Sequence, residues 1–523
     1  MKTQVITRQQ PVSTADSSPR DSVSAEEEAV MSDSSERTLT KPYCVYSSRK
    51  KTIIVLLATM TAFISTVSAQ IYLPAMSPMA RELNVTDEDI TLTITTYMIF
   101  QGISPMFVTS VADTRGRRPA YAFCFVIYIA ATVGLALVRD FAGAMALRSL
   151  QSIGSSSTMV LCSAVIADTI TSAERGQYFA YTLIPQALGP SVGPTLGGVL
   201  TQYLGWRSIF WFLTIYAAVM AILTIGGLPE TCRNMVQDGS ILPPKLYQTP
   251  WQLFQLRRSK HAITYASSDE KPPRQPESKP QKTVLSNICK VITLLFKKES
   301  GILLWSNGLS YITFYCVPAA MPFLLRDSYS LSETEIGLMY LPLAGGVVLV
   351  ALVSGRLFGW NYRRHCAARG LRFEHKSQVD INSFPIERTR LEIGIPMTIL
   401  AGVCTMAWGW AMHTKSHIAV ISVLNFFVGM GMACSNSCIN LVLVDTNQGQ
   451  AGTAMAASNI TKCLIGAGAT AAIVPLTTSI GAGPAFMVIG SAYFICCMLL
   501  VVVLMNGLKW RQQRVRDEKN DHI

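Results

Sequence analysis

The chain has 523 residues, of which 50% are hydrophobic and 15% charged, and its mean hydropathy is +0.33. A water-soluble domain of ordinary size needs a more polar surface, so this composition excludes a soluble protein and indicates one that lies in a bilayer. Basic residues outnumber acidic ones by 44 to 32, but they concentrate in alternate loops, which favours membrane topology over nucleic-acid binding.

Residues 1–51 form a polar segment rich in Ser, Thr and charge. The segment contains no apolar run with the flanks of a cleavable signal peptide, so we expect a disordered tail on the cytosolic side of the membrane. Arg49, Lys50 and Lys51 then lie on the inner flank of the first membrane span.

Apolar segments long enough to cross a bilayer recur from there almost to the end of the chain. A hydrocarbon core of about 30 Å needs roughly 20 helical residues per crossing. Twelve segments meet that length, at approximately residues 53–75, 90–111, 119–138, 142–166, 178–201, 208–228, 301–325, 334–358, 391–413, 417–440, 451–475 and 483–508. We therefore predict an all-α membrane protein with 12 transmembrane helices in two six-helix bundles, residues 52–231 and 301–508.

The connection over residues 232–300 contains the Pro- and Lys-rich piece SSDEKPPRQPESKPQK, which cannot bury a core. We expect a cytosolic linker, flanked by short apolar and basic stretches that fit interfacial helices on the inner leaflet. Residues 509–523 are expected to form a cytosolic tail, so that both termini face the cytosol. This orientation places Asn84 of an Asn-Val-Thr sequon outside, where it is either a glycosylation site or a chance match close to the membrane.

The stretch VADTRGRRPAYAF places four charges between the second and third spans. Gly116 permits a turn there, and Asp113, Arg117 and Arg118 lie at the inner membrane surface. Two interpretations are open. Either these charges only anchor the topology, or Asp113, Gly116, Arg117 and Arg118 form a latch, in which Asp113 pairs with an arginine, that holds the inner side closed in one state and breaks in another. Asp168, after the fourth span, lies at the same level and would complete such a network.

The second half of the chain contains a partial repeat of this stretch. YRR at 362–364 aligns with GRR at 116–118, each just after the second span of its half. Two related halves are typical of transporters, in which the substrate site lies where the halves meet.

Two ionisable residues stand out because they lie well inside predicted spans, Arg148 in the fourth and Lys462 in the eleventh. An ion near mid-bilayer costs about 2.5–3.5 kcal/mol on insertion scales, so each is a candidate functional residue unless it is a structural cation bonded to its neighbours. The first, second and seventh spans contain no acid, and a polar, positive cavity favours a substrate with a carboxylate over an organic cation. The uncharged residues predicted to line the substrate cavity are Gln70, Gln101, Gln151, Asn436 and Asn440.

Several of these motifs resemble those of the major facilitator superfamily. TSVADTRGRRP resembles the loop 2–3 signature of that family, although Thr109 replaces its leading glycine and Thr114 its usual basic residue. RSLQSIG, which contains Arg148 and Gln151, resembles the fourth-span motif. GWRSIFWF and PET look typical of the twelve-span drug:proton antiporters.

ALGPSVGPTLGG in the fifth span resembles the antiporter signature of the drug:proton group. Small residues at this spacing let two helices approach closely. The residues in register, for which we predict a conformational role, are Gly189, Gly193, Pro194, Gly197 and Gly198. FPIERTRL and LVDTNQGQAGTAMAASNITKCLIGAG resemble the fungal quinidine-resistance-type branch of the group.

The resemblance implies a proton antiporter that exports small organic compounds by alternating access, with the proton gradient as energy source and no cofactor. The positive cavity favours an acidic or amphipathic metabolite, such as an organic acid or a secondary metabolite. A broad exporter of cationic or neutral drugs and a non-transporting sensor on the same fold are the alternatives. No metal-ligand cluster, nucleotide fingerprint or catalytic motif occurs in the sequence, so an enzyme is not expected. We expect a monomer in the plasma membrane, with a vacuolar or other internal membrane as the alternative.

Overall fold

The computed structural model describes residues 46–170, 189, 192–236, 247–249, 291–368, 385–447 and 451–520. Within these ranges the chain is almost entirely helical and contains no strand. Most of the expected N-terminal tail and of the linker 232–300 lies outside the described residues, as do the last three residues of the expected C-terminal tail.

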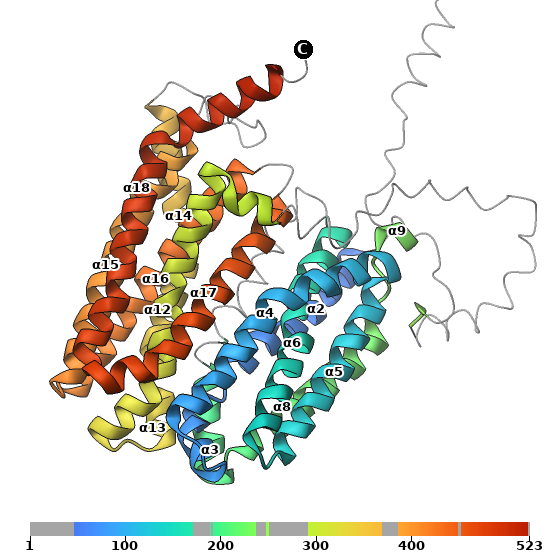
Figure 1. Cartoon of the computed structure of the whole chain (residues 1–523). Helices are drawn as coiled ribbons and strands as arrows, with labels where there is room; N and C mark the ends of the chain where they lie inside the picture. Colours follow the sequence, from blue (N-terminus) through green and yellow to red (C-terminus); the bar gives the residue numbers. More distant parts are fainter. Residues whose placement is uncertain are drawn as a thin grey trace, which may run out of the picture.

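The first half of the molecule is one group of packed helices (Figure 1). Its elements are α2 (Ser48–Gln70), the 3₁₀ turn η1 (Leu73–Ala75), α3 (Met76–Glu82), α4 (Asp87–Arg115), α5 (Arg117–Leu137), α6 (Phe141–Thr169), α8 (Arg207–Gly227) and α9 (Arg233–Val236). Residues 192–204 are also helical. Within this half α6 packs against α2, α4 and α5, and α8 packs against α2 and α5.

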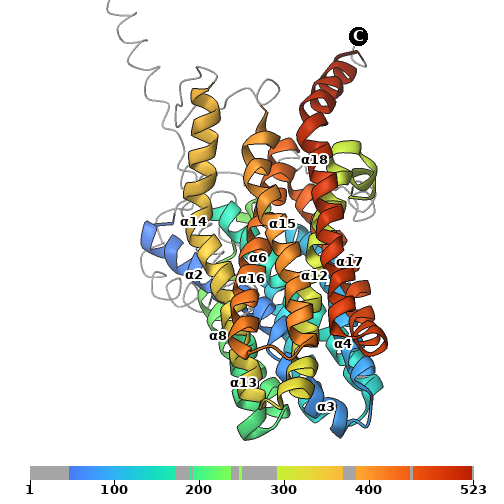
Figure 2. The ribbon, with the colours of Figure 1, turned by 90° about the vertical axis from the view of Figure 1, so that its left-hand side faces the viewer.

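The second half is the other group, and Figure 2 shows its helices side by side with the end of α18 projecting past α12. Its elements are α12 (Lys298–Tyr329), α13 (Glu333–Leu338), α14 (Tyr340–Ala367), α15 (Ile386–His413), α16 (Ile418–Thr446), α17 (Ala451–Ile480) and α18 (Ala482–Asn520). Here α15 packs against α16 and α18, and α12 packs against α16, α17 and α18.

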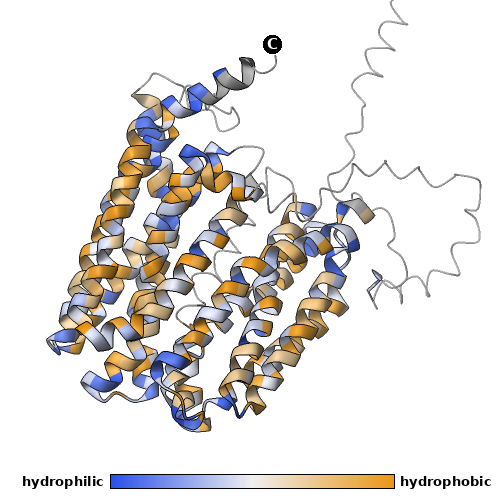
Figure 3. Cartoon of the chain, viewed as in Figure 1, coloured by the Kyte–Doolittle hydropathy of each residue, from blue (hydrophilic) through white to orange (hydrophobic). Residues whose placement is uncertain are grey.

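Ten helical segments of the described chain are long and apolar enough to cross a membrane. Figure 3 shows hydrophilic residues gathered towards the two ends of the helices and hydrophobic residues along their middle. α4 has the length for a crossing, with 29 residues, but Thr, Ser and Gln recur along it and it is not among the ten. The expected fifth span, 178–201, lies partly outside the described residues. The predicted all-α membrane fold is confirmed.

Two helices end elsewhere than the predicted spans for identifiable reasons. The apolar pattern over 53–75 continues past Gln70, but the helix breaks at η1, where Pro74 occupies the first turn, and resumes as α3. The span expected to end at residue 358 runs on to Ala367, because the polar and basic end of α14 stays helical beyond the apolar segment that sequence reading detects.

The two halves meet along α4 and α17 and at the end of the molecule formed by α3 and α13, here called the α3–α13 end. Along the first contact the Asn459 amide donates to the Gln101 carbonyl at 3.2 Å, and Thr95 donates to the Ala467 carbonyl at 3.4 Å. Towards the α3–α13 end, the Thr334 amide donates to the side chain of Gln202 at 3.1 Å.

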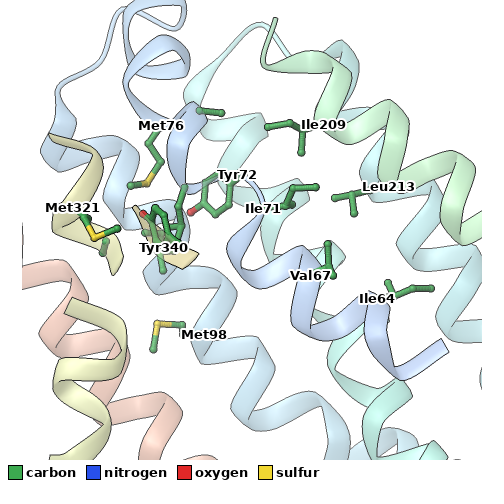
Figure 4. Close-up of a cluster of buried hydrophobic side chains, with 14 of the residues drawn as sticks. Ile64, Val67, Ile71, Tyr72, Met76, Met98, Ile209, Leu213, Met321 and Tyr340 are labelled. Atoms are coloured by element: carbon green, nitrogen blue, oxygen red, sulfur yellow. The ribbon is translucent and has the colours of Figure 1, made fainter. Parts of the chain in front are cut away.

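The buried hydrophobic cluster at the α3–α13 end contains side chains of both halves. In Figure 4 Ile71 lies towards Leu213 of α8, whereas Tyr72 lies on the side of Met321 and Tyr340, which belong to α12 and α14. The side chains of the two halves are therefore closely packed against one another at this end. At the opposite end, here called the α9 end, α9 and the C-terminal part of α18 lie in different halves (Figure 1).

Candidate functional site

Arg148 lies on α6 inside the first half, and its side chain is 1% exposed. The carbon of its guanidinium group lies 3.8 Å from the ring centre of Tyr72 and 4.4 Å from that of Tyr97, so two tyrosine rings hold it by cation–π contact. The tyrosine hydroxyls are anchored in turn, Tyr72 to Thr93 at 3.1 Å and Tyr97 to Ser155 at 2.8 Å. The position of the guanidinium group is therefore fixed.

The N–H groups of Arg148 are only partly satisfied. Nη1 donates to the side-chain oxygen of Gln151 and lies 3.5 Å from the carbonyl oxygen of Ser68. Within the described part of the chain Nε and Nη2 have no hydrogen-bond partner, and no carboxylate there forms an ion pair with this arginine. Unpaired donors on a buried cation are costly, and a bound anion would remove that cost.

Lys462 lies on α17 in the second half and is partly buried. Its Nζ lies 5.0 Å from the ring centre of Tyr311 on α12. Among the described residues no carboxylate forms a salt bridge with it. Both predicted cations therefore rest against tyrosine rings instead of acidic side chains.

Acidic residues on the helices around these cations lie only at the helix ends. α2 and α17 have none, and on α4, α6 and α12 each is among the first three or last three residues. These residues are Asp87, Glu88, Asp89, Asp113, Asp168, Glu299 and Asp327. The charges of Arg148 and Lys462 are thus left without a neutralising partner on these helices, in surroundings of low dielectric constant where electrostatic interactions are strong.

A small pocket lies between α2, η1, α4 and α12. Its lining includes two of the predicted binding residues, Gln70 and Gln101, together with Tyr97 and Tyr315. The side-chain oxygen of Gln101 is buried and has no hydrogen-bond partner among the described residues. Arg148 is not part of this lining, but Tyr97 touches both the pocket and the guanidinium group. Tyr97 therefore lies between the pocket and Arg148.

The predicted binding residues Asn436 and Asn440 belong to a polar cluster in the second half. Asn440 donates to Asn436 at 2.8 Å, and the buried Asn307 of α12 donates to Asn440 at 3.2 Å and to Ser458 of α17 at 2.6 Å. Sequence reasoning missed Asn307, although an amide inside an apolar span is a signal of a buried polar contact. The cluster joins α12, α16 and α17.

At the α9 end, Arg117 contacts two carboxylates. Its Nε donates to Asp168 at 3.0 Å, and its Nη1 pairs with Asp113, which lies four residues earlier near the end of α4. The Asp168 side chain is 12% exposed and that of Asp113 53% exposed, so Arg117 and Asp168 form the better buried pair. The structure thus brings the three predicted latch residues together, all within the first half.

This difference in burial predicts unequal effects of two substitutions. For the transporter that the sequence resemblance implies, we expect Asp168→Asn to lower the transport rate at least about fivefold and Asp113→Asn to lower it by less. Breaking a largely buried pair costs several kcal/mol, whereas a half-exposed partner contributes less than about 1 kcal/mol. Transport by both variants is compared at equal amounts of protein in the membrane. A larger effect at Asp113 would contradict the structural ranking.

Arg118, the other predicted latch residue with a charge, has a different kind of partner. Its guanidinium group donates to the carbonyl oxygens of Gln248, at 2.6 Å, and of Ile225 near the end of α8. The contact with Ile225 ties the start of α5 to the end of α8, and the contact with Gln248 ties α5 to the described linker segment 247–249. Among its described contacts Arg118 is therefore bonded to backbone, whereas Arg117 is bonded to carboxylates.

Glu230, in the PET motif, is the centre of a network that the sequence did not reveal. The side chain is 1% exposed. Its carboxylate accepts hydrogen bonds from the backbone N–H groups of Arg117 at 2.8 Å and Arg118 at 3.1 Å, and from those of the two residues that follow it, both at 3.0 Å. The first two N–H groups begin α5, where a helix favours a negative charge. Gly116 has a φ of 98°, and a β-carbon there would lie 2.6 Å from Glu230, so the junction requires glycine.

Glu230→Ala is expected to destabilise the first half by about 3 kcal/mol, because four backbone donors lose a buried charged acceptor. Glu230→Gln keeps the shape but turns one acceptor oxygen into a donor, so a smaller loss is expected. The midpoint of thermal unfolding in detergent measures both effects. Equal midpoints for the wild type and Glu230→Ala would show that this network contributes nothing to stability.

The second half contains a pair that matches Arg117 and Asp168. Arg390, near the start of α15, lies 3.5 Å from Asp445, which is the last residue but one of α16, as Asp168 is of α6. Residues 362–364, which align with the GRR stretch in sequence, remain inside α14. The structural counterpart of Arg117, which starts α5, is therefore Arg390, which lies near the start of α15.

The glycines of the fifth span bring its helix close to α2. A β-carbon on Gly189 would lie 2.5 Å from the Thr66 side chain, and one on Gly197 would lie 1.7 Å from the carbonyl oxygen of Ile71. Gly193 is less crowded, at 3.3 Å from the Ile71 nitrogen. These glycines therefore serve packing inside the first half.

Gly198 faces the second half instead. A β-carbon there would lie 2.3 Å from the carbonyl oxygen of Glu333, at the start of α13. Across the same contact, a β-carbon on Gly337 would lie 2.7 Å from the carbonyl oxygen of Pro194. Two glycines from opposite halves thus allow backbone to approach backbone at the α3–α13 end.

Asn84, the predicted glycosylation residue, is exposed in the turn between α3 and α4. The hydroxyl of Thr86, the third residue of the sequon, accepts from the Asp89 N–H at 3.1 Å in the capping box that starts α4. The sequon therefore lies directly against the beginning of a helix.

Comparison with known proteins gives the family. The sequence profile of the Major Facilitator Superfamily matches residues 58–470. The MFS-type transporter phiD of Fungal sp. is 36% identical over 92% of this chain and 72% of its own length, and the multidrug transporter QDR2 of Candida glabrata is 30% identical over 91% and 84%. A solved D-xylose–proton symporter shares the fold, with a TM-score of 0.58 and 12% identity over 86% of this chain and 97% of that one.

The family matches agree with the residues from which the resemblance was drawn. The matched region includes Asp113, Arg148, Gly198 and Lys462, and so contains both the charged cluster and the two buried cations. The family consists of transporters and not of enzymes. The chain belongs to the Major Facilitator Superfamily of multi-pass membrane transporters.

Proposed function

We propose that this protein exports a small acidic or amphipathic organic compound, such as an organic acid or a secondary metabolite, in exchange for protons. The observation that carries the proposal is the pair of intramembrane cations. Arg148 has two unpaired N–H groups, and both it and Lys462 rest on tyrosine rings without a carboxylate partner among the described residues. A carboxylate substrate would satisfy them, whereas an organic cation would be repelled.

The proposed orientation places the α9 end in the cytosol and the α3–α13 end outside, because Arg115, Arg117, Arg118 and Arg233 gather at the α9 end. With this orientation the contacts at Gly198 and Gly337 close the outer side. On this proposal the protein loads substrate from the cytosol, and alternating access releases it outside.

The latch residues fit the same proposal. Asp113, Arg117 and Asp168 pair with one another inside the first half while the halves touch at the opposite end. In the state that opens outward, we propose that this cluster meets the second half and holds the inner side closed. Proton transfer would use Asp113 or Asp168 at this surface, or Lys462, since the middle of the helices around the cations contains no acid.

Similarity to QDR2 favours a second candidate, a broad exporter of cationic or neutral drugs. The pocket lined by Tyr97, Tyr315, Gln70 and Gln101 is mostly uncharged and aromatic, which suits neutral amphipathic compounds as well. On this alternative the two cations are structural. The plasma membrane and a monomeric form are the proposed location and state for either function.

Efflux from cells with and without the protein, at two external pH values, tests the proposal. The export of metabolites is followed by untargeted profiling, and resistance to a panel of cationic drugs is followed in parallel. We expect acidic metabolites outside only when the protein is present, and more of them at acidic external pH. Drug resistance without export of any acid would replace the proposal by the second candidate, and efflux independent of the pH gradient would remove proton exchange.

A further inference from the structure

The two unneutralised cations belong to opposite halves of the transporter. Arg148 is held by α6 of the first half, and Lys462 by α17 of the second. Each is held by tyrosines of its own half, Arg148 by Tyr72 and Tyr97 and Lys462 by Tyr311. In the described ranges neither half supplies a carboxylate to the cation of the other. An anionic ligand is therefore the group that can engage both.

The two cations lie at different depths along the contact between α4 and α17. Cys463, next to Lys462, is level with Gly102 of α4, since a β-carbon on Gly102 would lie 3.0 Å from the β-carbon of Cys463. Tyr97, which contacts Arg148, precedes Gly102 by five residues, or about 7–8 Å along the helix at the α-helical rise. Arg148 and Lys462 also come from helices on opposite sides of this contact, and neighbouring helix axes lie about 8–10 Å apart, so we take the separation of the two charged groups to be on the order of 10 Å.

One carboxylate cannot bond to both groups across such a separation, because charge-assisted hydrogen bonds of this kind are about 2.7–2.9 Å long. We propose that the substrate carries two separate anionic groups, one bound by Arg148 and the other by Lys462, and so bridges the two halves. This inference rests on the proposed export of acidic compounds and narrows the substrate class to dicarboxylic and higher acids.

The aromatic contacts give the two ends of such a substrate distinct environments. The guanidinium group of Arg148 presents Nε and Nη2, two unpaired donors suited to the two oxygens of one carboxylate. The ammonium group of Lys462 acts as a point charge for the second. Between them, the pocket residues Tyr97, Met98 and Tyr315 offer an apolar and aromatic surface for the body of the molecule.

A bridging substrate also gives a reason for coupling between binding and the rocking of the halves. A ligand shifts a conformational equilibrium only through differential affinity for the two states. A diacid whose ends bind different halves binds most tightly in the state where the distance between Arg148 and Lys462 matches the distance between its two carboxylates. A monoacid binds one half only, so its affinity is less sensitive to the separation of the two cations.

The experiment measures the midpoint of thermal unfolding of the purified full-length protein in detergent. The ligands are a series of α,ω-dicarboxylates of increasing chain length, from succinate to dodecanedioate, here called the ladder. Each is compared with the monocarboxylate of equal carbon number, in a buffer of low salt so that inorganic anions compete little. We expect an optimal chain length at which the diacid reaches half-maximal stabilisation at a concentration at least about tenfold lower than the monoacid. Lys462→Met should bring the diacid to the level of the monoacid, whereas Arg139→Met, at an exposed turn of the first half, should leave the ladder unchanged.

The outcomes separate the two proposals. Stabilisation by monoacids and diacids alike, with no advantage of the second carboxylate at any length, would overturn the bridging substrate and leave acid export standing. Stabilisation by cationic drugs and by no acid would overturn both. The length dependence is measured on the unaltered protein, so the test does not depend on the folding of any variant.

Discussion

Replacing Arg148 by methionine is expected to lower transport of an acidic substrate by roughly a hundredfold. Removing one partner from a buried, hydrogen-bonded charge pair costs about 3 kcal/mol, which corresponds to that factor. Methionine is unbranched and fills a comparable part of the space next to Tyr72 and Tyr97, and an apolar group in place of a buried ion is often tolerated by the fold. Transport is measured in membrane vesicles at equal amounts of protein.

Two further variants make the result specific. Arg148→Lys keeps the charge but loses the planar group that contacts both rings, so we expect an intermediate loss, mostly of apparent affinity. Arg139→Met removes a cation of the same half at an exposed position and should transport normally. Unchanged acid transport by Arg148→Met would assign Arg148 a structural role and withdraw the observation on which the proposed function rests.

Hydropathy was sufficient to predict the membrane fold but not the details that shape the site. Long apolar segments predict spans because a bilayer sets their length. The break after Gln70 was missed because the residues on both sides of it are apolar, and yet that break is what positions Tyr72 against Arg148. Hydropathy reports the polarity of the side chains and carries no information on a helix break between two apolar segments.

In the charged cluster at the α9 end, the residues that belong to one motif or lie at the same depth in the membrane were predictable. Asp113 and Arg117 are four residues apart in one short turn, and Asp168 lies at the end of a neighbouring span, so their pairing follows from closeness in the chain and from membrane topology. Glu230 and the pair of Arg390 with Asp445 were not identified, because their partners are distant in the chain and are brought together only by helix packing.

The contact at Gly198 is expected to be as sensitive as Arg148, for a steric reason. A methyl group on Gly198 would lie 2.3 Å from the carbonyl oxygen of Glu333, which is too close for any real contact, so Gly198→Ala prevents the halves from meeting as they do here. We expect the variant to favour the state open at the α3–α13 end and to transport at least about tenfold more slowly. Cysteine placed at Ala69, in the lining of the central pocket, then reports opening through its rate of reaction with an impermeant maleimide added outside.

Matched glycine variants distinguish closure from a general loss of packing. Gly337→Ala introduces a methyl group 2.7 Å from the Pro194 carbonyl oxygen across the same contact and should reproduce the effect, whereas Gly226→Ala meets no atom within 4 Å and should behave as the parent protein. Gly197→Ala meets Ile71 inside the first half and should lower thermal stability instead. The cysteines that the structure describes are buried, so the Ala69→Cys signal stands above a low background. Equal labelling of the Gly198→Ala and Gly226→Ala proteins would mean that the two halves do not separate at this contact during transport.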